Sequence, residues 1–238
     1  MKINKFWKSW KNKTNQEKDY IKAVERAVDW MSKQSFFKEI ISIYIKGSFV
    51  FRELNNKSDI DFVPIVKYSR SLQKIREVRD KHKNFLSPVS ILPISMQELK
   101  ANKRYKKNER GGRPDYFAVL LPYHKLVYGK AISQKDCKIR TDMEIYSSLK
   151  KSIINLFLPL YYKKQYGFSQ LAKKFSHLVY WEERVKGNKL LPTWNALKKE
   201  CKKNFLLQKT IYFRIHPTKN KEVREKYIKD LGEYLKVK

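Results

Sequence analysis

Residues 43–66, IYIKGSFVFRELNNKSDIDFVPIV, hold the feature that most constrains the fold, because two carboxylates interrupt what is otherwise typical of a buried strand. Asp59 and Asp61 stand among apolar neighbours. Burying an ionised carboxylate is costly unless a cation or a hydrogen-bond donor meets it. Side chains at positions i and i+2 of a strand point to the same face, so this pair would project together, about 7 Å apart along the strand. The pattern therefore predicts a strand that presents two carboxylates to one cation.

The chemistry of the pair indicates which cation this is. Two hard carboxylates suit Mg²⁺ rather than zinc or copper, and Mg²⁺ in proteins usually completes its shell with water and substrate phosphates. Gly47 and Ser48 end the preceding apolar run. The glycine lets a phosphate approach the backbone, and Ser48 offers hydrogen bonds to it. We therefore expect Asp59 and Asp61 to be the metal ligands of a nucleotide-bound Mg²⁺, with Gly47 and Ser48 on the phosphates. For Arg52, in the next loop, a phosphate contact and an exposed structural role are equally open.

The N-terminal half has the pattern of an α/β unit. Apolar spacing predicts a helix over 16–34, strands over 39–47, 58–66 and 88–94, and a short edge strand over 124–130. The first two strands are expected to pair across the polar loop between them. A charged helix is expected over 72–85. Ser95 with Glu98 matches a capping box that starts a basic helix running towards Asn108, and 109–115 is expected to be a loop.

The C-terminal half is nearly all helix. Thr141, Ser169 and Thr193 are the expected caps of three helices, and the apolar stripe from Val223 to Leu235 predicts a final one. The expected fold is therefore α/β (α+β), with a small mixed-sheet domain over 1–135 and a helical domain over 136–238.

The order of these features resembles the DNA polymerase β-type nucleotidyltransferase superfamily, above all its minimal and aminoglycoside-type members. The resemblance covers roughly residues 35–130. It is best in 43–66, where KSDIDFVPIV is similar to the family's serine–Asp–x–Asp–apolar run, and KLVYGK is similar to its late strand and turn. The resemblance implies Mg²⁺-dependent transfer of a nucleoside monophosphate from an NTP to a hydroxyl group.

One position departs from the family pattern. Its members carry a third carboxylate on the next strand, and Ser90 aligns with that position. A serine supplies neither the charge to hold a second metal nor a base for the attacking hydroxyl. Glu98 and Asp115 are candidate substitutes. The departure leaves two hypotheses: an active nucleotidyltransferase, or a catalytically reduced relative that binds nucleic acid or a protein partner in a toxin–antitoxin or defence pair.

Charge bears on the acceptor. The chain has 54 Lys and Arg against 23 Asp and Glu, a net charge of +31. This favours a polyanion such as RNA over a cationic small molecule, although lysine used as surface filler is the alternative. Residues 106–117, KKNERGGRPDYF, have a composition suited to phosphate contact and base stacking or to a surface loop. Glu182 and Glu183 are the helical half's candidate site carboxylates, with surface solvation as the alternative.

The remaining composition predicts a cytoplasmic protein. The N-terminus lacks the apolar core of a signal peptide, and the longest apolar run, residues 152–162, is too short for a transmembrane segment. Cys137 and Cys201 stand alone, which argues against a zinc ribbon or a disulfide framework.

Overall fold

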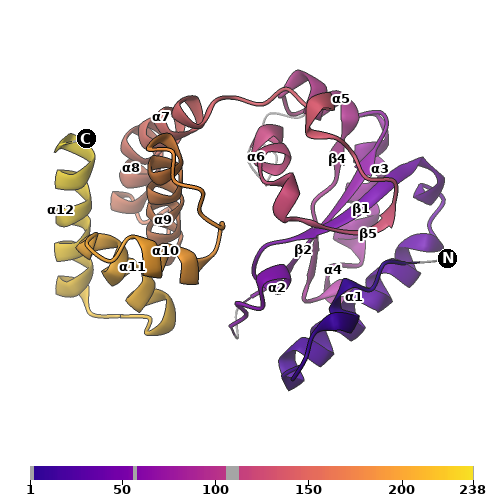
Figure 1. The fold of residues 1–238 in the computed structure, drawn as a ribbon, viewed down its shortest axis with the longest axis horizontal. Helices are drawn as coiled ribbons and strands as arrows, with labels where there is room; N and C mark the ends of the chain where they lie inside the picture. The colour runs from indigo at the N-terminus through magenta and orange to yellow at the C-terminus, as the bar shows by residue number, and fades with distance from the viewer. Residues whose placement is uncertain (1–2, 56–57, 106–112, 238) are drawn as a thin grey trace. The chain divides into compact units, whose positions relative to one another are not determined.

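The computed structural model describes residues 3–55, 58–105 and 113–237, and the chain divides into two compact units, Met1–Ile139 and Arg140–Lys238. The first unit combines a sheet with helices, and the second is helical (Figure 1). The predicted fold class, a small mixed-sheet unit followed by a helical unit, is confirmed.

A five-stranded mixed sheet forms the centre of the first unit. Its strands are β1 (Ile40–Lys46), β2 (Ile60–Val66), β3 (Val89–Ile91), β4 (Ile94–Ser95) and β5 (Lys125–Gly129). The order is β3-β2-β1-β5, with β4 paired to β2 off this path. β1 is antiparallel to β2 and β5, whereas β2 is parallel to β3 and β4. The predicted pairing of the two strands that flank the polar loop is confirmed.

Helices and short helical turns cover both faces of this sheet (Figure 1). They are η1 (Phe6–Ser9), α1 (Asn15–Ser32), η2 (Phe37–Glu39), α2 (Ser48–Phe51), α3 (Ser71–Lys81), α4 (Lys83–Leu86), α5 (Met96–Ala101), α6 (Pro114–Val119), η3 (Leu121–Tyr123) and η4 (Gln134–Asp136). Ile45 and Phe62 pack with α1 and α3, while Tyr44 and Val63 pack with α5 and α6. Because side chains alternate along a strand, Lys46 and Asp61 belong to the α5–α6 face.

The segment after Ser95 differs from the sequence prediction. The predicted capping box is present, but α5 ends at Ala101 rather than near Asn108. Asn102 is left-handed, with φ 47°, and its amide nitrogen donates to Asp115 at 2.8 Å. Most of the predicted loop, and residues 106–112 of the basic aromatic stretch, lie outside the described residues. The last two residues of that loop instead begin α6, whose first residue, Pro114, has a fixed φ suited to a helix start.

The second unit is built from α7 (Asp142–Ser152), a π-helical turn (Ile153–Phe157), α8 (Leu158–Tyr162), α9 (Phe168–Val185), α10 (Trp194–Glu200), α11 (Phe205–Ile215) and α12 (Lys221–Val237). The caps predicted at Thr141 and Thr193 are confirmed. The cap predicted at Ser169 is wrong, because α9 begins at Phe168 and its N-cap is Gly167. The N–H of Gly167 donates to Oε1 of Gln170.

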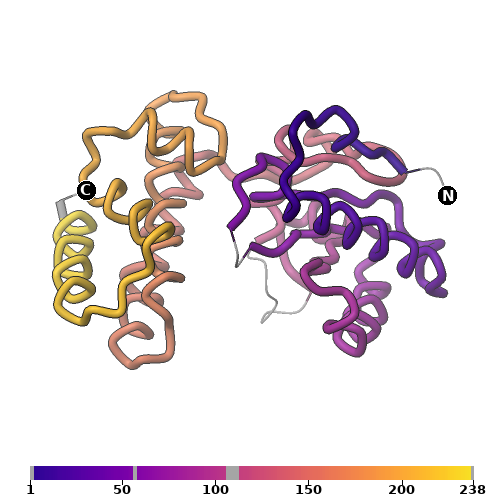
Figure 2. The backbone as a smooth tube through the Cα atoms, turned by 90° about the horizontal axis from the view of Figure 1, so that it is seen from below, coloured from indigo at the N-terminus to yellow at the C-terminus, as the bar shows by residue number. Residues whose placement is uncertain are grey.

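Aromatic contacts join the last helices of the second unit. The Tyr227 ring of α12 meets Phe168 of α9 and Phe213 of α11 edge to face, at centroid distances of 5.3 and 5.6 Å. Figure 2 shows α12, in yellow, beside the other helices of this unit. Among the described residues, none of the helices is both long and apolar enough to cross a bilayer.

Candidate functional site

Three neighbouring strands bring polar side chains together at one end of the sheet. Lys46, the last residue of β1, lies opposite Asp61 of β2, and Asp61 lies beside Ser90 of β3. Residues that are paired across strands project to the same face. Ser90, Asp61 and Lys46 therefore form a row, called here the strand-end row, on the α5–α6 face of the sheet.

The two predicted metal ligands differ in their surroundings. Asp61 is inside β2 with its side chain 27% exposed, whereas Asp59 is exposed and directly precedes the strand. Lys46 Nζ lies 2.9 Å from Asp61 Oδ2. The cation that meets the half-buried carboxylate is thus part of the chain itself. Sequence reasoning missed Lys46, although a lysine at the end of an apolar strand, directly before Gly47, was a signal that could have revealed it.

Gly47 makes the turn that follows β1. Its φ of +81° is a conformation that residues with a side chain rarely adopt. A Cβ placed there would lie 3.4 Å from Asp61 Oδ2, so a side chain at this position would also crowd the carboxylate. Ser48 follows as a half-exposed residue that begins α2. The predicted phosphate-binding step, Gly47-Ser48, therefore adjoins Asp61.

Arg52 is engaged within the first unit. Its Nε and Nη2 donate to the carboxylate of Glu17 at 2.6 and 3.0 Å. Its Nη1 and Nη2 also donate to the carbonyls of Lys11 and Asn12, both at 3.1 Å. The guanidinium therefore anchors the α2 turn to the start of α1. These contacts support the structural alternative for Arg52 over the predicted phosphate contact.

Asp61 is the one carboxylate of the strand-end row. Ser90 occupies the place next to Asp61 on β3, the strand on which the resemblance noted above predicts a third acid. Glu98 is buried, and its carboxylate binds the backbone N–H groups of Ser95 and Tyr105. Asp115 is buried and paired with Asn102. The carboxylates of both candidate substitutes are thus engaged in local hydrogen bonds, and neither residue lies on β3.

His124 extends the row on the other side. It directly precedes β5, whose Lys125 lies opposite Ile45, so His124 comes next to Lys46. Its ring packs against Phe117 in a tilted arrangement with centroids 4.7 Å apart, and its Nδ1 is buried and makes no hydrogen bond to the described residues. Burial, with a smaller contribution from the charge of Lys46, lowers the pKa of His124 to about 3. The imidazole is therefore neutral at physiological pH.

The donor set fits one Mg²⁺. The ion pair uses Oδ2 of Asp61, which leaves Oδ1 as a ligand atom, and Asp59 is exposed beside it. Mg²⁺ commonly takes one or two carboxylates and fills the rest of its shell with water and phosphate oxygens. Within the described ranges, no group of three or more His, Cys, Asp or Glu side chains is placed to bind a metal ion.

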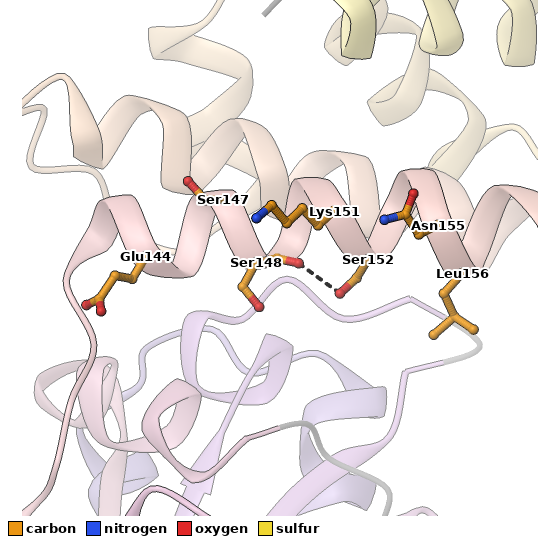
Figure 3. A pocket seen from close by; sticks show the side chains of 7 residues that line it. All are labelled: Glu144, Ser147, Ser148, Lys151, Ser152, Asn155 and Leu156. Atoms are coloured by element: carbon orange, nitrogen blue, oxygen red, sulfur yellow. Dashed lines mark hydrogen bonds between the residues drawn. The ribbon is translucent and has the colours of Figure 1, made fainter.

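Within the described part of the second unit, the candidate carboxylates Glu182 and Glu183 are both engaged by neighbouring side chains. Glu182 accepts a hydrogen bond from the Tyr234 hydroxyl, which connects α9 to α12. It also lies 3.0 Å from Lys186 Nζ. Glu183 is paired with Lys186 and Asn188. A hollow on one side of α7 and the π-helical turn is lined by Glu144, Ser147, Ser148, Lys151, Ser152, Asn155 and Leu156 (Figure 3). Its one acid, Glu144, already caps α7 by binding the N–H of Thr141.

Comparison with known proteins supports the fold assignment. The structure is similar to the crystal structure of a spectinomycin adenyltransferase from Enterococcus faecialis, determined with ATP and spectinomycin. The TM-score is 0.60, and the match covers 92% of this chain and 99% of the other. The chain shares the fold of this adenyltransferase. The two sequences are 14% identical, so the likeness is one of fold. No protein-family model matches the chain, and no curated protein matches it by sequence.

Proposed function

We propose that this chain is an Mg²⁺-dependent nucleotidyltransferase that moves a nucleoside monophosphate from an NTP to a hydroxyl group. The observation that carries the proposal is the position of Asp61 beside the Gly47 turn, with Asp59 two residues before it, within a fold shared with an adenyltransferase over 92% of the chain. Hard carboxylates beside an open glycine turn are what a metal-bound triphosphate needs.

Each residue has a role in this proposal. Asp59 and Asp61 hold the Mg²⁺, while Gly47 and Ser48 bind the phosphates. The bound Mg²⁺ would supply neutralisation of the charge that develops on the phosphates. The acceptor oxygen forms a bond to the α-phosphorus, the bond from this phosphorus to the bridging oxygen breaks, and pyrophosphate leaves with the electron pair. The hydroxyl proton passes to solvent water.

Two observations bear on the acceptor. The structural neighbour was crystallised with spectinomycin, which supports a small-molecule hydroxyl. The net charge of +31 supports RNA as a second candidate, because exposed lysines gather at Lys198, Lys199, Lys202 and Lys203. A cationic acceptor would be repelled by the same field. Because these observations favour different acceptors, spectinomycin and tRNA are both used as probe acceptors.

Label transfer from each of the four α-³²P NTPs to these probes tests the proposal. We expect the wild-type protein to label one acceptor and release pyrophosphate. Asp59→Asn and Asp61→Asn should each lower the rate at least about a hundredfold, since a metal contributes several kcal/mol to the transition state. Asp19→Asn, which removes an exposed carboxylate on α1, is the matched control and should leave the rate unchanged.

The outcomes separate the hypotheses. Full activity in both Asp59→Asn and Asp61→Asn would contradict the proposed metal site. Nucleotide binding by the wild-type protein, without transfer to any acceptor, would favour the catalytically reduced binding protein that Ser90 suggests.

A further inference from the structure

Lys46 holds one of the two carboxylate oxygens through which Asp61 could bind a cation. Its Nζ lies 2.9 Å from Asp61 Oδ2, and a Cβ added to Gly47 would lie 3.4 Å from the same oxygen. The side chains of Lys46 and Asp61 are 30% and 27% exposed, so both are within reach of a ligand from solvent. Any metal ion that takes Asp61 therefore competes with, or repels, the ammonium group.

The rest of the strand-end row offers Lys46 no second anion. Ser90, on the far side of Asp61, is uncharged, and His124, on the near side of Lys46, is neutral. The one ion pair described for Lys46 is with Asp61. An ammonium that is displaced from Asp61 would thus point, still charged, into the end of the sheet where Gly47 and Ser48 turn.

We propose that Lys46 is a phosphate ligand that neutralises Asp61 in the free protein and transfers to the triphosphate when the metal–nucleotide complex binds. The inference rests on the proposed function. Lysine suits this exchange, because its ammonium group is a compact charge with three donors on a flexible stem. Mg²⁺ alone must either displace the ammonium group or bind Oδ1 beside it, in both cases without compensation, whereas Mg²⁺ with a triphosphate provides Lys46 with a new anionic partner. Metal binding therefore depends on the nucleotide, and nucleotide binding depends equally on the metal.

Lys46→Met separates the two halves of this proposal, because they change affinity in opposite directions. Calorimetric titration of the full chain with Mg²⁺ alone should show affinity tightened about two- to fivefold, the value of a partly exposed ion pair. Titration with α,β-methylene-ATP at saturating Mg²⁺ should show affinity weakened at least about tenfold, because a charge-assisted hydrogen bond is lost. If label transfer identifies another base, its α,β-methylene analogue replaces that of ATP.

Lys130→Met is the matched control. It removes the same charge from an exposed lysine next to Ile41, at the opposite end of β1. Both affinities should stay within about twofold of the wild-type values, since exposed charges at this separation are largely screened. Lys46→Arg, which keeps the charge, should retain most of the nucleotide affinity.

Three results would overturn the proposal. If both affinities tighten in Lys46→Met, the lysine only blocks Asp61. If both weaken together with the melting temperature, the lysine is structural. If neither changes, the ion pair has no part in binding. Failure of the wild-type protein to bind any of the four NTPs would instead refute the proposed function and this inference with it.

Discussion

Glu17→Gln should destabilise the first unit by about 2–3 kcal/mol, because the carboxylate of Glu17 meets donors on both oxygens. Oε1 accepts from Arg52 Nε at 2.6 Å, and Oε2 accepts from Arg52 Nη2 at 3.0 Å and from the Thr14 N–H at 2.8 Å. Glu17 is 4% exposed, so water cannot replace these donors. Whichever way a glutamine amide is turned, its NH₂ group faces an N–H donor.

The magnitude follows from these contacts. Each hydrogen bond to a charged group is worth about 1.5–3 kcal/mol net. The glutamine keeps one acceptor oxygen, and the partly exposed guanidinium of Arg52 recovers some hydration, which limits the cost to the range given. Asp29→Asn is the control, because it removes an exposed carboxylate from an i,i+4 pair with Lys33 and should cost at most about 0.5 kcal/mol.

The pH dependence provides a second readout. The hydrogen bond from Arg52 is the main reason that the pKa of Glu17 lies below its usual value. A depressed pKa gives stability that is present above the unfolded pKa of about 4.3 and is lost as the pH falls through the folded pKa. The difference between wild type and Glu17→Gln should therefore be largest near neutral pH and shrink below about pH 4.

Urea unfolding of the full chain at several pH values, with hydrogen exchange of α1 peptides to identify the unit, measures both effects. A difference that grows in acid, or one no larger than that of Asp29→Asn, would refute the reasoning.

Arg52→Met should likewise speed exchange in α1 while leaving nucleotide affinity within about twofold. A large loss of nucleotide affinity with unchanged exchange would show that Arg52 is a phosphate ligand after all.

Two further predictions concern charge. Ser90→Asp should tighten Mg²⁺ binding about tenfold, because it adds a hard ligand beside Asp61. The like charges on the paired positions should lower the free energy of unfolding by up to about 1 kcal/mol. Unchanged affinity in a titration would mean that Ser90 does not face the metal. Filter binding of tRNA over a salt series should give a slope near −4 for about six phosphate contacts, at roughly 0.7 per contact. Charge reversal of Lys198, Lys199, Lys202 and Lys203 should bring that slope closer to zero, whereas Asp59→Asn should leave it unchanged. A slope near zero in the wild-type protein would favour the small-molecule acceptor.

Much of the first unit could be predicted because its patterns are local. The apolar runs of β1 and β2, the turn at Gly47 and the capping box at Ser95 each depend on a few adjacent residues. The early end of α5 depends instead on a contact from Asn102 to Asp115, thirteen positions away. No local pattern reports such a contact. The unpredicted α11, over Phe205–Ile215, was obscured by apolar residues that occupy nearly every side of the helix and give no stripe.

The candidate site shows the same division between local pattern and register. Asp59 and Asp61 could be proposed from their spacing alone, but the partner of Asp61 depends on which residue of β1 lies opposite it. A shift of one residue in the β1–β2 register would place Ile45 there and turn Lys46 to the other face. With the observed register, Asp61 has an uncharged serine, Ser90, on one side and a positive charge, Lys46, on the other. Both residues weaken the attraction of the row for a metal ion alone. The same two residues leave a triphosphate as the ligand that supplies the missing negative charge, which is why metal and nucleotide are expected to bind together.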